Sequence, residues 1–323
     1  MNDLDYIFAV ARIRVKEKTL LRDSDIAQMI TMPDADAVIE FLLTHGWGDT
    51  ASSRDADAIL AAEEAKTLSL INELRLDPEI LEILSYPQLF HNLKAGIKET
   101  VTSEPHPSAF YPLESYGRET ILKIIKEKTY DQLPEPLREL APRAFELMLQ
   151  TRDGQAVDML VDRETLSAME KAGKASSNPL FKNYLLSTVA VSNIKIAVRA
   201  QKMKKSREFI ENALAPCTYL DTKELAKAAS GTFEELLGYL QRTDYSQGAE
   251  ALKESPSAFE RWCDNRLIGS LRGERTHSES FGPVLAYYLA RQNEIKTVRI
   301  ILTAKANGFS EDAIRERVRE MYV

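Results

Sequence analysis

Apolar residues recur with the 3.6-residue period of an α-helix along almost the whole chain, and this periodicity restricts the folds open to it. Strand-like alternation is nearly absent. Its one instance, residues 12–16, is also expected to be helical, because no partner strand is visible nearby. Glycine and proline number only 13 each among 323 residues, which favours helices further. The sequence therefore predicts an all-α protein without a significant β-sheet.

Capping and breaking residues divide this pattern into helices. Short helices are expected to start at Ser24 and Pro33, and Pro78 and Pro87 are each expected to begin another, since proline is tolerated in the first turn. The proline-rich stretch 101–112 is predicted to be a loop. The other predicted helices are 2–18, 52–75, 114–129, 135–150, 153–173, 179–204, 206–215, 221–229, 232–242, 256–272, 282–306 and 310–322. The helix 179–204 has no charged residue between Lys182 and Lys195 and is expected to be buried.

Charge and motifs argue against several classes of function. A net charge of −7 opposes nucleic-acid binding, which normally needs a basic excess. There is no GxxxxGK[ST] phosphate loop, and the four histidines lack metal-ligand spacing, so we expect no cofactor and no metal. The carboxylate pairs Glu63-Glu64 and Glu234-Glu235 are interpreted as solvated helix surface. No motif therefore recommends an enzyme, and a helical enzyme with a dispersed site stays open as an alternative.

The sequence also lacks the usual signals for membranes and secretion. No run of 18 apolar residues occurs, so no segment is expected to span a bilayer. The first residues are acidic and do not resemble a signal peptide. Cys217 and Cys263 have no CxxC spacing and are interpreted as ordinary thiols in a reducing compartment. We therefore expect any membrane role to depend on a membrane-embedded partner.

Three lysines mark an internal repeat. Lys94, Lys195 and Lys296 are separated by 101 residues in both intervals, and each follows an apolar stretch on a predicted helix. One helical turn further on, each is followed by another cation: Lys98, Arg199 and Arg299. Two residues before each lysine stand Asn92, Asn193 and Glu294, the last being the departure from the pattern. Equal spacing in equal context predicts a threefold repeat.

A second similarity indicates how the repeat closes. Residues 21–44, near the N-terminus, resemble residues 220–242, which follow the helix of the middle unit. In the unit that contains residues 21–44, the helix that matches the helix of the middle unit lies near the C-terminus. The two chain ends are therefore expected to pack together and complete one unit. We predict a first unit of residues 1–79 with 276–323, a second of 80–175 and a third of 176–275, arranged around a central socket.

Several segments resemble one known family in the same order and spacing. They are Tyr6-x-x-x-x-Ala11-Arg12-Ile13-Arg14-Val15, Asn92-Leu93-Lys94, Asn193-Ile194-Lys195, Gly282-Pro283-Val284 and Ile295-Lys296-Thr297-Val298-Arg299. Together they are similar to the C subunit of the prokaryotic V-type (A/V-type) rotary ATPase, the counterpart of the d subunit of the eukaryotic V-ATPase. The resemblance covers the whole chain.

The resemblance implies a funnel-shaped, all-helical, non-catalytic connector with pseudo-threefold symmetry. Its expected partners are the central stalk subunits D and F on one side and the membrane proteolipid rotor ring on the other, with coupling to H⁺ or Na⁺ transport. It implies a cytoplasmic protein, peripheral on the inner face of the plasma membrane, that contacts the membrane only through the ring. The alternative is a generic α-solenoid adaptor, but such arrays repeat every 30–50 residues or so and have open ends.

Six cations are the candidate contacts to the stalk: Arg12, Arg14, Lys94, Lys195, Arg199 and Lys296. In one interpretation they line the socket or its rim and meet acidic or polar stalk surface. In the other, they pair with carboxylates on neighbouring helices or face water. The sequence leaves both interpretations open.

Overall fold

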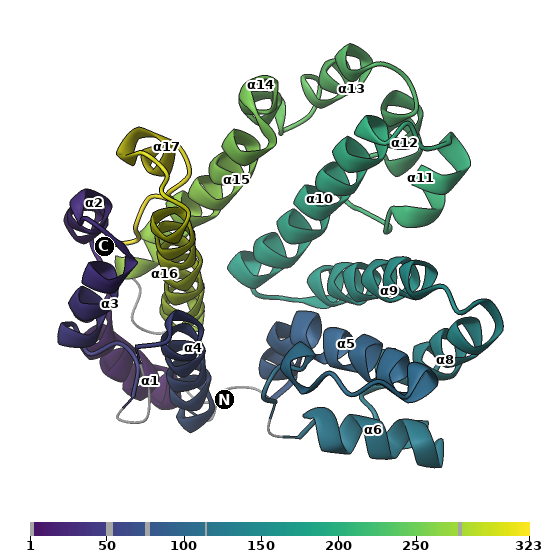
Figure 1. The fold of residues 1–323 in the computed structure, drawn as a ribbon, viewed down its shortest axis with the longest axis horizontal. Coiled ribbons are helices and arrows are strands. Elements are labelled where there is room, and N and C mark those ends of the chain that lie inside the picture. Colours follow the sequence, from purple (N-terminus) through teal and green to yellow (C-terminus); the bar gives the residue numbers. More distant parts are fainter. Residues whose placement is uncertain (1–2, 50–53, 75–77, 114, 277–279) are drawn as a thin grey trace. The chain divides into compact units, whose positions relative to one another are not determined.

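The computed structural model describes residues 3–49, 54–74, 78–113, 115–276 and 280–323, and it divides into two compact units (Figure 1). Unit 1 joins the two ends of the chain, Met1–Pro78 and Tyr245–Val323, and unit 2 is Glu79–Asp244. All regular secondary structure in these described ranges is helical, which confirms the all-α prediction. None of the described helices is long and apolar enough to cross a membrane.

Unit 1 is built around one long helix, α16 (Gly282–Ala306), with α1, α3, α4 and α15 packed against it (Figure 1). Val298 and Ile301 on α16 are fully buried against Leu42 of α3 and Ile59 of α4. Such contacts are possible only if the two chain ends come together. The other helices of the unit, in chain order, are α1 (Asp3–Glu17), α2 (Asp23–Thr31), α3 (Ala35–Thr44), α4 (Ala56–Glu73), α14 (Ser246–Glu254), α15 (Pro256–Leu271), the 3₁₀ helix η3 (Arg272–Thr276) and α17 (Glu311–Arg315).

Unit 2 is centred on α10 (Pro179–Lys202), which packs on α9, α11 and α12 (Figure 1). Asn178 caps α10 by accepting a hydrogen bond from the Phe181 amide at 3.0 Å. The apolar residues Leu185, Val189 and Ile194 are fully buried, as the sequence predicts. The other elements are α5 (Pro78–Thr102), η1 (Pro107–Ala109), α6 (Arg118–Glu127), η2 (Tyr130–Gln132), α7 (Glu135–Arg138), α8 (Leu140–Thr151), α9 (Gly154–Ala175), α11 (Arg207–Ala213), α12 (Thr222–Ala229) and α13 (Phe233–Leu240).

Pro87 does not begin a helix, which corrects the sequence-based prediction. It lies inside α5, although an internal proline removes one hydrogen bond and crowds the preceding turn. Tyr86, Leu89 and Phe90 beside it are buried. We attribute the continuity of α5 to this packing, which holds both halves of the helix in one apolar environment.

The last predicted helix is also shorter than expected. α17 ends at Arg315, because side chains from other elements engage the backbone and side chains of the residues that follow. Met321 donates its amide hydrogen to Asp23 at 3.0 Å, and the buried Arg319 donates to Asp264 at 2.8 Å. Conversely, α14 occupies a stretch for which no helix was predicted. Residues 52, 53 and 75 of the predicted helix 52–75, residue 2 of the predicted helix 2–18 and residue 114 of the predicted helix 114–129 lie outside the described residues.

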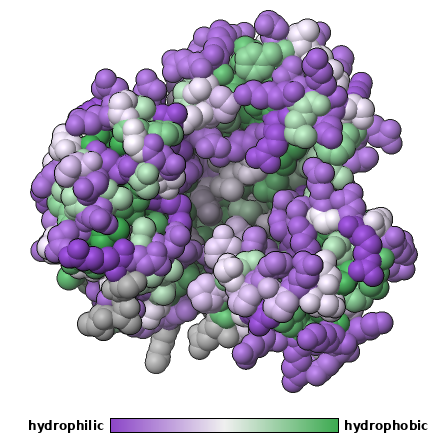
Figure 2. Space-filling view, in the orientation of Figure 1, coloured by the Kyte–Doolittle hydropathy of each residue, from purple (hydrophilic) through white to green (hydrophobic). Residues whose placement is uncertain are grey.

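The surface of both units is mostly hydrophilic on the face that Figure 2 shows, with hydrophobic residues in small separate areas.

Candidate functional site

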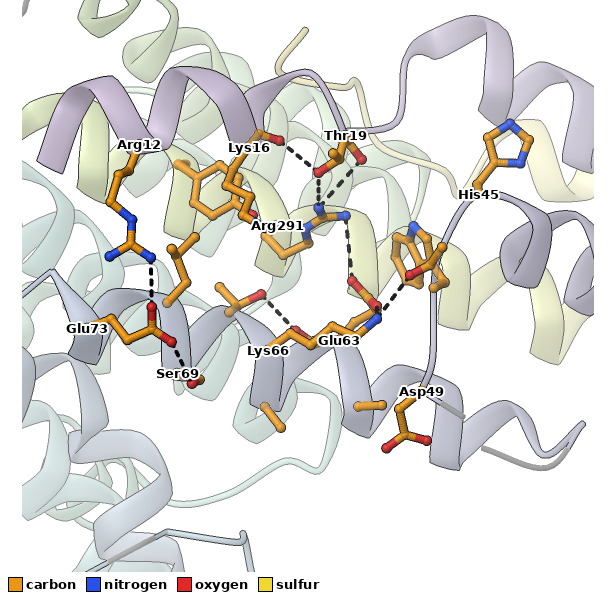
Figure 3. Close-up of a pocket in the computed structure, with 17 residues that line it drawn as sticks. Arg12, Lys16, Thr19, His45, Asp49, Glu63, Lys66, Ser69, Glu73 and Arg291 are labelled. Carbon is orange, nitrogen blue, oxygen red and sulfur yellow. Dashed lines mark hydrogen bonds and ion pairs between the residues drawn. The ribbon is translucent and has the colours of Figure 1, made fainter. Parts of the chain in front are cut away.

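A buried group of charges lies between α4 and α16 of unit 1, beside a cavity of about 730 Å³ (Figure 3). Arg291, only 4% exposed, donates from Nη1 to Glu294 Oε2 at 2.8 Å, and the same nitrogen lies 3.9 Å from Glu63 Oε2. Its Nη2 donates to the Thr19 hydroxyl at 3.0 Å. Lys66 donates to the other oxygen of Glu63 at 2.6 Å. Two basic and two acidic side chains thus form a continuous series of contacts from the cavity wall into the interior.

The burial of Glu63 corrects the prediction that the Glu63-Glu64 pair is solvated surface. Glu63 is 5% exposed and also accepts a hydrogen bond from the Gly48 amide at 3.1 Å. Its main countercharge, Arg291, comes from a helix near the other end of the chain, so local charge patterning could not reveal it. A buried carboxylate is tolerable here because each of its oxygens has a cationic or amide partner. Glu234 and Glu235 are exposed, as predicted.

The surroundings of the cluster set its charge states. Burial raises the pKa of Glu294 to about 8, against the opposing effects of Arg291 and of the Leu21 amide. Burial alone disfavours the charge of Arg291, but Glu294, Tyr287 and Glu63 outweigh it and raise the pKa of the guanidinium. The guanidinium also lies 5.5 Å from the Trp47 ring centre, within cation–π range. Arg291 therefore stays charged, and Glu294 is the member of the cluster that burial brings into the physiological pH range.

Asn193, two residues before Lys195, clamps a backbone segment. It is fully buried, accepts a hydrogen bond from the Ala215 amide at 3.0 Å and donates to the Ala215 carbonyl at 2.9 Å. Asn92, the matching residue on α5, does the same with Tyr111, accepting from its amide at 2.8 Å and donating to its carbonyl at 2.9 Å. Each asparagine thus ties its helix to a segment further along the chain.

Glu294 holds the same position on α16 and makes the corresponding contact. It is 1% exposed, and its Oε1 accepts a hydrogen bond from the Leu21 amide at 2.8 Å. A carboxylate cannot reproduce the donor half of the asparagine contact, and its second oxygen binds Arg291 instead. The substitution therefore preserves the acceptor role, and the bond joins the C-terminal part of the chain to the N-terminal part.

The predicted cations on α1 are both in ion pairs. Arg12 lines the cavity and donates to Glu73 at 2.7 Å (Figure 3). The hydrogen bond from Arg12 is the main cause that holds the pKa of Glu73 below its ordinary value. Arg14, further along the same helix, donates to Glu17 at 2.8 Å. The cavity brings Arg12, but not Arg14, close to the Arg291 cluster.

The predicted lysines on α5 and α16 each meet an aspartate of another helix. Lys94 donates to Asp162 of α9 at 2.8 Å, and Lys296 donates to Asp264 of α15 at 2.5 Å. These contacts agree with the interpretation in which the cations pair with carboxylates of neighbouring helices. Lys195 is half-buried on α10.

Arg199 is exposed and shares a groove with Lys94 in unit 2. The groove has a volume of about 420 Å³ and is formed largely by α9, α10 and α11. The structure therefore brings two of the six predicted cations together in unit 2, while Arg12, Arg14 and Lys296 belong to unit 1. No group of three or more histidine, cysteine or acidic side chains placed to hold a metal ion occurs in the part of the chain that is described.

The buried charges of this all-helical chain join its two ends. The family model of the ATP synthase (C/AC39) subunit matches residues 9–317, so the chain belongs to this family. Three relatives are similar over nearly their whole length. The C subunit of the V-type sodium ATPase of Enterococcus hirae is 23% identical over 96% of this chain and 97% of the relative. The C subunit of the V-type ATP synthase of Thermus thermophilus is 23% identical over 97% and 98%, and that of the A-type ATP synthase of Pyrococcus furiosus is 21% identical over 98% and 90%.

Proposed function

We propose that this chain is the non-catalytic connector of a V/A-type rotary ATPase, joining the rotating central stalk to the membrane proteolipid ring. The observation that carries the proposal is the family match along residues 9–317, with relatives named as C subunits over nearly their full length. Its partners are then the stalk subunits D and F and the ring, and its place is the cytoplasmic face of the plasma membrane. It has no catalytic site, needs no cofactor and contacts the membrane only through the ring.

A connector that transmits torque must resist deformation. The three buried clamps support this role, because Asn92, Asn193 and Glu294 each fix a long helix to a separate backbone segment. They stand at equivalent positions of the predicted 101-residue repeat, which favours a pseudo-threefold funnel with units 1–79 plus 276–323, 80–175 and 176–275. The six cations Arg12, Arg14, Lys94, Lys195, Arg199 and Lys296 remain our candidate stalk contacts in this proposal.

Removal of the chain from the complex tests the proposal. Membrane complexes assembled with and without it are compared for ATP hydrolysis and for ion transport into vesicles. We expect hydrolysis by the head to persist without the chain while ATP-driven transport is lost, and restored transport when the purified chain is added back. Transport that continues at the normal rate without the chain would contradict a connecting role. Affinity purification of the tagged chain from native membranes should recover D, F and the ring together.

A further inference from the structure

One surface of unit 1, on α1, combines exposed apolar side chains with cations. Phe8 and Val15 are each 64% exposed, and Ile7 is 43% exposed. The opposite side of α1 is anchored to the unit by Ala9 and Ile13, both fully buried. The other large hydrophobic residues exposed in the described ranges lie on separate elements: Tyr111, Leu149, Met203, Tyr219 and Phe309. Only α1 therefore groups such residues on one helix within the described part of the chain.

The exposed residues have the spacing of a helix–helix seam. Phe8, Ala11 and Val15 are three and four residues apart, which corresponds to positions a, d and a of a heptad. Ala11 is exposed and small, so a second helix could approach closely between the two larger side chains. Helices pack through such rows of side chains, whereas an extended strand would match every second residue. The geometry points to a helix as the partner element.

Cations border this seam on both sides. Arg12 and Arg14 take the flanking positions e and g, where charged residues select the partner of a helix pair. Their pairs with Glu73 and Glu17 are each neutral, while the exposed Lys16 and Lys18 extend the positive charge beyond them. We therefore expect a complementary helix to carry acidic residues beside its apolar stripe.

We propose that the α1 face, made up of Phe8, Ala11, Arg12, Val15 and Lys16, docks an amphipathic helix of another subunit that carries Asp or Glu beside an apolar stripe. This inference rests on the proposed function and deepens it by assigning the surface and the chemistry of its partner. The apolar seam supplies affinity by removing Phe8 and Val15 from water, and the cations guide the encounter.

Photo-crosslinking in the assembled complex tests the identity of the occupant. Phe8 is replaced by p-benzoylphenylalanine, and Leu149, which is 47% exposed on α8, receives the same substitution as the control. We expect a crosslink from position 8 to a helical peptide of a partner subunit with apolar and acidic residues, and no crosslink from position 149 to that peptide. Crosslinks from position 8 only to this chain itself, to a second copy or to lipid would overturn the assignment.

Paired substitutions measure the contribution of the α1 face. Phe8→Ser with Val15→Ser should weaken binding of the purified chain to its partner complex roughly 100-fold. The loss of one buried interface anchor of this kind weakens affinity more than about tenfold. Lys16→Glu with Lys18→Glu should slow association about tenfold and flatten its salt dependence. Leu149→Ser is the control and should bind as the unchanged protein does. Because all five altered side chains are exposed, melting temperatures should not change, and they are measured on the same samples.

Different results would contradict the proposed function and the docking assignment. If the unchanged chain is not recovered with stalk and ring subunits, the proposed function fails. If the unchanged chain is recovered but the Phe8/Val15 variant binds equally well, only the docking assignment is wrong.

Discussion

Replacement of Asn193 by alanine should destabilise unit 2 far more than an ordinary polar substitution on the same helix. The Asn193 side chain is fully buried, and both of its polar atoms bind the backbone of Ala215. Ala215 is itself fully buried, so water cannot replace the lost partners in the intact fold. The alanine variant leaves one amide hydrogen and one carbonyl oxygen without hydrogen bonds in the interior.

The magnitude follows from those two groups. A buried polar group left unsatisfied costs about 1–3 kcal/mol, and relaxation of the segment around Ala215 would recover part of it. We therefore expect the free energy of unfolding to fall by about 2–4 kcal/mol. For a unit of this size each kcal/mol corresponds to roughly 2–4 °C, so a loss of 3 kcal/mol lowers the melting temperature by about 6–12 °C.

Calorimetry and urea unfolding of the full chain measure this loss. The matched control is Asn183→Ala on the same helix, where the side chain is exposed and accepts only two long hydrogen bonds, from Ser187 and Tyr219, each at 3.3 Å. The control should change stability by no more than about 0.5 kcal/mol. If Asn193→Ala melts within about 2 °C of the control, the clamp does not stabilise the unit and the reasoning is refuted.

Three other changes should have distinct signatures. The pKa of Glu294 is raised from 4.5 to about 8, so the unfolded chain loses this proton at a lower pH than the folded one does. The free energy of unfolding should therefore fall as pH rises through that window, by at most ~1.4 kcal/mol per pH unit. Urea unfolding from pH 5 to 9 should show a smaller pH dependence in Glu294→Gln, and an equal pH dependence in both proteins would contradict the reasoning. Gly96→Ala should destabilise by about 1–3 kcal/mol, since the new methyl group would lie 2.5 Å from a methyl carbon of Ile121, whereas Gly269→Ala, on a helix with open space, should stabilise by up to ~1 kcal/mol in the same melts. Asp153→Ala removes the cap that binds two amides at the start of α9 and should cost about 1 kcal/mol, and an unchanged urea midpoint would count against the cap.

Local patterns predicted most of the secondary structure because local physics determines it. The apolar runs in 179–204 and 282–306 indicated two buried helices, and α10 and α16 occupy these ranges with Val189 and Val298 among their buried side chains. The prediction failed at Pro87, which was expected to begin a helix but lies inside α5, where Tyr86, Leu89 and Phe90 are buried. Tertiary packing of this kind is not visible in a short window of sequence.

The charge cluster was missed because its members are distant in sequence. Glu63 and Arg291 belong to opposite ends of the chain, and no spacing rule connects them. One signal was available: Glu294 replaces the asparagine found at the two matching positions, and the matching lysines are 101 residues apart. A carboxylate that replaces a repeated asparagine in an apolar helix needs a buried partner, and Arg291, one turn earlier, is a candidate that the helix itself supplies.

The position of that glutamate has a thermodynamic reason. Asn92 and Asn193 clamp amides only 19 and 22 residues away, whereas Glu294 clamps an amide 273 residues away. Loop-closure entropy grows as (3/2)RT ln n, so the longer closure costs about 2 kcal/mol more than the shorter ones. A hydrogen bond to a charged group contributes about 1.5–3 kcal/mol, compared with about 0.5–1.5 for a neutral one. The Glu294 side chain also accepts a hydrogen bond from the charged Arg291, so an additional bond to a charged group stands at the clamp where the connectivity of the chain helps least.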